Sequence, residues 1–144
     1  MQFSLNKLLL AALSCSVSTT FAAPAKSMMA NASWTITDLK RVCDSADTSC
    51  TWTFGINTGS NATECTYVVN GSPASRANGG PSDCGAYTIT SGWSGQFGAD
   101  NGFTTLSVVE EASRQIVWPA YTDKQLANGT VVKPDQSYTP SILP

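Results

Sequence analysis

Cys50-Thr-Trp-Thr-Phe-Gly-Ile56 is the stretch of sequence that decides the fold class. Large apolar residues at positions 52, 54 and 56 alternate with threonine or glycine at the positions between them. Successive side chains of a β-strand point to opposite faces of a sheet, so this period of two is typical of a strand with one buried face. The stretch therefore predicts a half-buried β-strand and not a helix.

The rest of the chain repeats this pattern in short β-type runs separated by turn signals. No window of eleven or more residues shows a sustained helical period. We expect an all-β fold, a small antiparallel β-barrel or sandwich of about eight strands, as one domain over residues 34–144. The predicted core consists of the apolar faces of these strands: Trp34, Ile36, Trp52, Phe54, Ile56, Tyr67, Val69, Tyr87, Ile89, Leu106, Val108, Ile116 and Trp118.

Several local features are predicted outside the clearest strands. Asp38 follows Trp34 and Ile36 at the same spacing and is placed on their face, and Lys40-Arg41 is interpreted as a solvated strand end. The glycines and prolines of residues 70–83 predict an irregular loop. Asn128-Gly129 predicts a hairpin turn that returns through residues 130–133, followed by an extended, unpaired C-terminal tail that contains Pro134, Pro140 and Pro144.

The N-terminal residues have the features of an export signal. Lys7 precedes an apolar run at residues 8–13, and small residues follow before Pro24. We interpret residues 1–22 as a signal peptide and residues 23–33 as a flexible lead-in. The sequence thus predicts a secreted, extracellular protein without membrane insertion.

Four cysteines remain once Cys15 is removed with the signal peptide: Cys43, Cys50, Cys65 and Cys84. An even number in an exported chain indicates disulfides, whereas a zinc site is disfavoured because the spacing contains no CxxC pair and the chain has no histidine. Three connectivities are available to four cysteines. The strand pattern favours Cys43 with Cys50 at the mouth of a hairpin and Cys65 with Cys84 across the long loop.

Four Asn-x-Ser/Thr sequons are candidate glycosylation sites, at Asn31, Asn61, Asn70 and Asn128. At residues 70 and 128 the Asn-Gly dipeptide also has a structural interpretation, since it favours tight turns. Asn61 is the strongest candidate and Asn70 the weakest, because Pro73 follows the latter closely.

The absence of histidine restricts the chemistry that this chain can perform. It removes histidine-assisted nucleophiles, HExxH metal sites and a base that titrates near neutral pH. A carboxylate-based hydrolase is the one hydrolase class left open, and Glu110-Glu111 is interpreted as a solvated hairpin tip instead. Asp83 and Asp123 neighbour turn positions and are likewise interpreted as solvated carboxylates. With 8 Lys and Arg against 10 Asp and Glu and no basic block, nucleic-acid binding is not expected. We predict a non-enzyme without cofactor, metal or catalytic residues.

Four residues are candidates for contact with a partner. Arg76 carries the one charge of the predicted loop before Asp83, and loops on a rigid sheet are common recognition elements. Trp93, Trp118 and Tyr121 are candidates for an aromatic platform that binds sugar rings, but core or cross-strand packing is the favoured interpretation because Trp118 falls in an alternating run.

Four segments carry a family resemblance: Trp34-Thr-Ile-Thr-Asp-Leu-Lys-Arg-Val-Cys43, Cys50-Thr-Trp-Thr-Phe-Gly-Ile56, Cys84-Gly-Ala-Tyr-Thr-Ile89 and Trp118-Pro-Ala-Tyr-Thr-Asp-Lys-Gln-Leu126. They resemble small secreted proteins of filamentous ascomycetes, including hypersensitive-response-inducing elicitors, and are similar to the Alternaria major-allergen β-barrel family. The resemblance implies a compact extracellular β-barrel that plants recognise, sometimes with defence or cell-death responses. The spare cysteine that supports dimerisation in the allergen has no match here, so we expect a monomer.

The predicted function is that of a secreted fungal effector or elicitor. It would bind an extracellular or surface protein of a host plant and modulate or trigger defence or cell death. A cell-wall glycan-binding module is the alternative, and a carboxylate hydrolase comes third.

Overall fold

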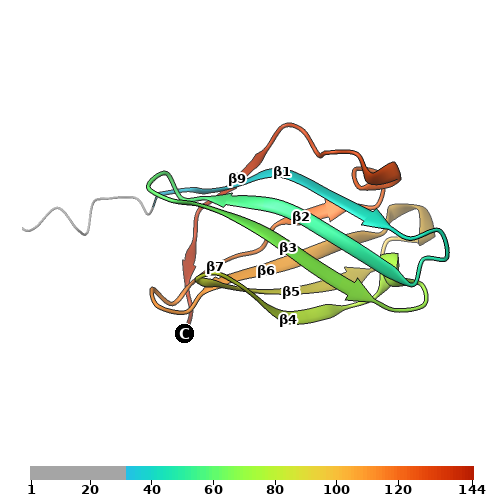
Figure 1. The fold of residues 1–144 in the computed structure, drawn as a ribbon, viewed down its shortest axis with the longest axis horizontal. Helices are drawn as coiled ribbons and strands as arrows, with labels where there is room; N and C mark the ends of the chain where they lie inside the picture. Colours follow the sequence, from blue (N-terminus) through green and yellow to red (C-terminus); the bar gives the residue numbers. More distant parts are fainter. Residues whose placement is uncertain (1–31) are drawn as a thin grey trace, which may run out of the picture.

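The computed structural model describes residues 32–144, which form two antiparallel sheets that pack face to face (Figure 1). One sheet has the strand order β3-β2-β1-β9, and the other has the order β10-β7-β6-β5-β4, with β8 also paired to β6. The strands are β1 Trp34–Cys43, β2 Ser49–Asn57, β3 Ala62–Asn70, β4 Gly79–Cys84, β5 Tyr87–Ser94, β6 Phe103–Glu110, β7 Gln115–Val117, β8 Ala120–Thr122, β9 Gln136–Tyr138 and β10 Ser141–Ile142.

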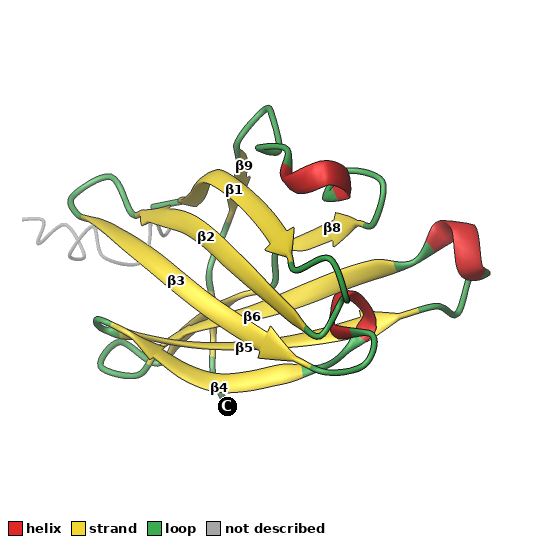
Figure 2. Ribbon diagram, turned by 45° about the vertical axis from the view of Figure 1, so that its right-hand side comes forward, coloured by secondary structure: helices red, strands yellow, loops and turns green. Residues whose placement is uncertain are grey.

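This architecture confirms the all-β prediction and selects the sandwich from its two alternatives. The helical segments of the described chain are the short 3-10 helices η2 (Ala74–Arg76), η3 (Ala99–Asn101) and η4 (Ala127–Gly129) (Figure 2). Within residues 32–144, no helix is long and apolar enough to cross a membrane. The predicted signal peptide, the lead-in up to residue 31 and the candidate acceptor Asn31 lie outside the described residues.

The core lies between the two sheets and is built from the predicted strand faces. All predicted core residues are buried except Trp118, but Ile116 is buried on the outer face of its sheet and does not belong to the core cluster. Trp34 of β1 meets Tyr87 of β5 edge to face, with ring centroids 5.5 Å apart. The Tyr67 hydroxyl of β3 and the Ser91 hydroxyl of β5 are hydrogen-bonded across the core at 2.9 Å. These contacts link one sheet to the other, so the interior fixes how the sheets are placed.

Both predicted disulfides are confirmed. Cys43 and Cys50 lie opposite each other on β1 and β2 and close the hairpin at its mouth. Cys65 of β3 is joined to Cys84 of β4 and therefore links an edge strand of one sheet to an edge strand of the other.

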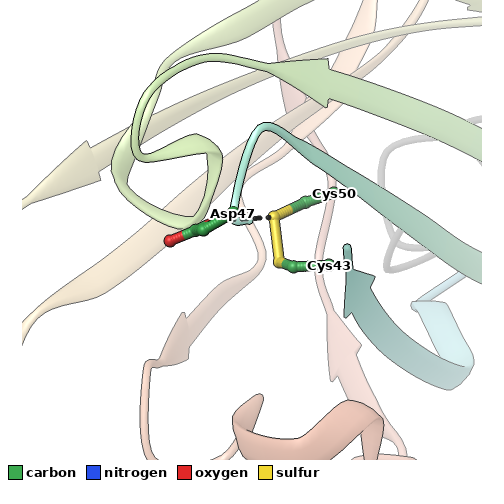
Figure 3. Close-up of side chains that lie close together, drawn as sticks. All are labelled: Cys43, Asp47 and Cys50. Atoms are coloured by element: carbon green, nitrogen blue, oxygen red, sulfur yellow. Dashed lines mark hydrogen bonds between the residues drawn. A yellow bond between two sulfur atoms is a disulfide. The ribbon is translucent and has the colours of Figure 1, made fainter. Parts of the chain in front are cut away.

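Asp47 lies beside the first disulfide, in the loop between β1 and β2 (Figure 3). Its Oδ1 is 3.7 Å from Cys50 Sγ, a contact without a shared proton because a disulfide sulfur carries none. The carboxylate instead accepts hydrogen bonds from the amide of Ser75, at 2.8 Å, and from the Ser75 hydroxyl. Asp47 thus ties the stapled hairpin to η2, which positions the neighbouring Arg76.

The predicted face of Asp38 is wrong, because β1 contains a β-bulge. The pairing with β2 shifts between Thr37 and Lys40, and Asp38 adopts a positive φ of 48°. The extra residue reverses the inside-outside alternation that follows it. Leu39 is consequently buried with Trp34 and Ile36, and Asp38 is exposed.

The prediction that residues 70–83 lack regular structure is also wrong. They contain η2 and the start of β4, which pairs with β5 at the edge of its sheet. An edge strand tolerates Pro81 because only one side of it must be hydrogen-bonded, and the pairing is irregular between Gly79 and Ser82. Gly80 has a φ of 85°, and a Cβ there would lie 2.5 Å from the Ile89 carbonyl oxygen, so glycine is required at this position.

The C-terminal region differs from prediction as well. Residues 130–133 form no hairpin strand, although Asn128 and Gly129 both have positive φ as in the predicted turn. The Val132 amide instead donates to the Leu39 carbonyl at 2.7 Å, so this segment crosses back over the bulge in β1. The tail is paired, because β9 adds to β1 and β10 adds to β7.

Candidate functional site

One end of the sandwich carries the three 3-10 helices of residues 32–144, next to the loop between β1 and β2 (Figure 2). Between them lies an open pocket of about 420 Å³, lined by Arg76, Ala99, Asp100, Asp123, Lys124 and Ala127. Segments that lie far apart in the sequence therefore form one surface at this end.

Trp93 is half-buried and contacts two of the residues that line this pocket, Arg76 and Asp123. The Arg76 guanidinium carbon lies 5.3 Å from the centre of the Trp93 ring, a cation–π contact. The indole Nε1 of Trp93 donates a hydrogen bond of 3.0 Å to Asp123 Oδ2. The ring is thus held by a cation on one side and by a carboxylate at its polar edge.

Arg41 supports this arrangement from the interior. Its guanidinium Nη1 lies 3.7 Å from Asp123 Oδ1 and donates to the Ser75 carbonyl oxygen at 3.0 Å. The guanidinium carbon also lies 5.5 Å from the centre of the Trp52 ring. We call Arg41, Trp52, Arg76, Trp93 and Asp123 the end cluster, a chain of contacts that runs from the core to the surface.

The prediction that Arg41 belongs to a solvated strand end is wrong, because only 8% of its side chain is exposed. Burial lowers the pKa of the Arg41 guanidinium, and the opposite charge of Asp123 partly offsets that effect. The group stays protonated at physiological pH, since an arginine pKa lies far above it. Arg41 Nε and Asp123 Oδ1 are both buried without a hydrogen-bond partner. Their attraction is therefore that of a close charge pair and not that of a fully hydrogen-bonded bridge.

The four predicted contact residues do not lie together. Arg76 and Trp93 meet in the end cluster. Tyr121 is 2% exposed and faces the core beside Thr104, which also pairs with Trp93. Trp118 is 51% exposed and lies outside the end cluster. Trp93, Trp118 and Tyr121 therefore form no common platform, and the favoured core packing is confirmed for Tyr121 and wrong for Trp118.

Alternation along the chain explains the position of Trp118. Val117 faces the core opposite Val108, and Tyr121 faces it from β8. Trp118 differs from both by an odd number of residues and therefore points outward. Ile116, also on the outer face of the sheet, is buried where β10 pairs with β7 at Ser141.

Sequence reasoning missed two members of the end cluster. Arg41 was missed because the bulge at Asp38 reverses the inside-outside alternation that the preceding residues of β1 set. Asp123 was missed because its place beside a turn suggested a solvated carboxylate. The sequence held one chemical hint that the two residues pair. Arg41 is an arginine on a strand with an inward face, and Asp123 is a carboxylate that follows a strand with the inward Tyr121.

The remaining predicted residues lie away from the end cluster or at its border. Glu110 ends β6, and Glu111 is exposed in the following turn, as predicted for a hairpin tip. Asn61 is exposed in the turn between β2 and β3, Asn70 is exposed at the end of β3, and Asn128 is exposed in η4. Glycan attachment at these three positions stays a prediction.

Comparison with known proteins identifies the family. The family model described as Effector TSP1 matches residues 35–143, which is nearly the whole of the sandwich. The protein Effector TSP1 of Hypocrea virens (strain Gv29-8 / FGSC 10586) is 60% identical over 133 residues, with 88% of this chain and 90% of that protein covered. These matches support a small fungal effector, and the chain belongs to the Effector TSP1 family.

Proposed function

We propose that this protein is a secreted effector that binds an extracellular or surface protein of a host plant through the end cluster and thereby modulates defence. Membership of an effector family and two disulfides, which persist in oxidising compartments, support secretion. In this proposal the protein acts by binding and not by catalysis.

The observation that carries the proposal is the way in which Trp93 and Arg76 are held. Tryptophan and arginine are the residue types most often found as binding hot spots. Asp123 fixes the polar edge of the indole, and Arg41 and the first hairpin fix Asp123 and η2 from behind. Such preorganisation reduces the entropy that is lost on binding, so an anchor of this kind favours a stable complex.

The surroundings of Trp93 suit a protein surface. Arg76 and Lys124 provide cations, whereas Asp100 and Asp123 provide carboxylates, around an open pocket. Mixed charges at the border of an aromatic anchor are typical of protein interfaces, in which charged pairs set register and specificity.

The test is binding of purified protein to a host protein recovered from plant apoplast and then produced separately. We expect Arg76→Ala and Trp93→Ala each to weaken that binding about tenfold or more, as loss of a hot spot would. Arg114→Ala is the matched control, because Arg114 is an exposed arginine in the turn between β6 and β7, at the other end of β6. Equal loss in all three variants would contradict the role of the end cluster.

The biological part of the proposal is tested by infiltration of the protein into leaves. A change in cell death, oxidative burst or resistance, in either direction, is the expected outcome, and it should be lost with Trp93→Ala. Leaves that respond to the protein no differently from leaves that receive buffer would refute the proposed action on defence.

A further inference from the structure

The outer face of the second sheet is uncharged over β5, β6 and β8, and the carboxylate of Asp83 lies at its edge, on β4 opposite Thr88. Alternation places residues of β5, β6 and β8 outward wherever their neighbours, such as Ile89, Leu106 and Tyr121, are buried. The outward residues of these strands are Thr88, Thr90, Gly92, Ser94, Phe103, Thr105, Ser107, Val109, Ala120 and Thr122. Hydroxyl groups dominate this face, and none of these side chains carries a charge.

Exposed aromatic rings lie along the same face. Phe103, at the start of β6, stacks on Phe97 with ring centroids 6.0 Å apart and an angle of 26° between the rings. Phe97 is 66% exposed and Trp118 is 51% exposed, which makes them the two most exposed aromatic side chains in the described chain. A single exposed apolar side chain is ordinary, whereas several aromatic rings exposed on one face form a patch of the kind that marks an interaction site.

The pairing of β6 with β8 gives the spacing of these rings. Phe103 lies opposite Thr122, and Thr105 lies opposite Ala120. Trp118 and Thr122 both point outward and are four residues apart in the chain. Because Thr122 lies opposite Phe103, the backbone positions of Phe103 and Trp118 are about 13 Å apart along the strands. Thr105 and Ser107 lie between them on β6. We call Phe97, Phe103, Thr105, Ser107 and Trp118 the aromatic strip.

We propose that the aromatic strip binds a neutral β-1,4-linked polysaccharide. The ring face of a sugar is apolar and packs on an exposed aromatic ring, and its hydroxyls both donate and accept hydrogen bonds, as threonine and serine do. The lack of charge within the aromatic strip matches a neutral polymer and gives no attraction to a charged one. A β-1,4-linked chain is a flat ribbon, which can follow a line of rings on a flat sheet.

This site differs from the predicted platform in its residues and from the end cluster in its chemistry. Of the three residues predicted for a platform, only Trp118 belongs to the strip. The end cluster is formed by inward and end-facing side chains, and the strip by outward ones. Polysaccharide binding therefore does not depend on the proposed host protein.

The experiment is depletion of purified protein from solution by microcrystalline cellulose and by crystalline chitin. We expect binding to at least one of them that persists at about 1 M NaCl, where the screening length is only about 3 Å. Starch granules, which are α-linked, and polygalacturonate, which is charged, should not bind comparably. No depletion by either β-1,4-linked polymer, or binding that is lost at high salt, would overturn the proposal.

Variants locate the site. Trp118→Ala and Phe97→Ala should each weaken binding about tenfold, whereas Val68→Ala is the control, because Val68 is 48% exposed on the other sheet. Unchanged melting temperatures will show that the variants are folded. Unaltered binding in both aromatic variants would overturn the assignment. Arg76→Ala and Trp93→Ala should keep full polysaccharide binding, so failure of the strip and failure of the proposed host contact can be told apart.

Discussion

Removal of the Asp123 carboxylate should destabilise the whole sandwich, although Asp123 is a partly exposed residue in a loop. Asp123→Ala leaves the Arg41 guanidinium, which is 8% exposed, without its counter-charge. Loss of one partner of a buried pair costs about 3–5 kcal/mol. In this variant Arg41 keeps its contacts with the Ser75 carbonyl and the Trp52 ring, and Asp123 itself is 27% exposed. We therefore expect the loss of the Asp123 charge to lower the free energy of unfolding by about 2 kcal/mol.

The hydrogen bond from Trp93 adds a second, separable contribution. Asp123→Ala also removes the acceptor of the Trp93 indole, which should cost about 1 kcal/mol more. Asp123→Asn keeps an acceptor for the indole but loses the charge. We therefore expect Asp123→Ala to lower the free energy of unfolding by about 3 kcal/mol and Asp123→Asn by about 2 kcal/mol.

Urea unfolding followed by tryptophan fluorescence measures these differences. A loss of 3 kcal/mol corresponds to a fall in melting temperature of about 10 °C for a domain of this size. The double variant Arg41→Met with Asp123→Leu leaves no buried charge behind. We therefore expect removal of the charge pair itself to change the free energy of unfolding by no more than about 1 kcal/mol relative to the parent. If Asp123→Ala loses less than about 0.5 kcal/mol, or if the double variant is less stable than Asp123→Ala, the buried pair does not act as described.

Three other predictions concern stability. Replacement of Cys65 and Cys84 by serine should cost about 3 kcal/mol in urea unfolding, because the bridge spans 19 residues and restricts the unfolded chain; a loss below 1 kcal/mol would contradict this. Tyr67→Phe leaves the buried Ser91 hydroxyl without its partner and should cost about 1 kcal/mol, and adding Ser91→Ala should cost less than the sum of the two single changes. The Asp38 backbone amide and Lys133 hold the pKa of Asp135 below its usual value. The stability that the Asp135 carboxylate contributes is therefore present above the unfolded pKa of about 4 and is lost as the pH falls through the lower folded pKa. Melting temperatures measured from pH 6 to pH 2 should fall less steeply for Asp135→Asn than for the parent.

The strands and the disulfides could be predicted because they depend on local patterns. Trp52, Phe54 and Ile56 alternate without interruption, and the structure buries all three. The pairing of Cys65 with Cys84 followed from a strand on each side of a loop, and that arrangement is present even though part of the loop is an edge strand.

The errors arose where a residue outside the local pattern decides the structure. Pro81 is a loop signal in the sequence, but it is tolerated in β4 because β4 lies at the edge of the assembled sheet and is hydrogen-bonded on one side only, to β5. The tail was predicted to be unpaired because β9 and β10 are short, and their partners β1 and β7 lie far away in the sequence or outside the local pattern of the tail. The end cluster unites five residues from separate elements, so no sequence window contains its signal.

The bulge at Asp38 determines which of two adjacent cations serves the interior. Its extra residue shifts the parity of β1, so that Arg41 lies opposite Trp52 on the core side and Lys40 lies opposite Thr53 on the solvent side. With a regular strand the two would exchange roles, and a flexible ammonium would meet Asp123 in place of a planar guanidinium. Among related chains, a one-residue gap or insertion near this position changes which of the following residues face the core. The counterpart of Arg41 should therefore be identified by the side of the strand that it faces and not by its aligned position alone.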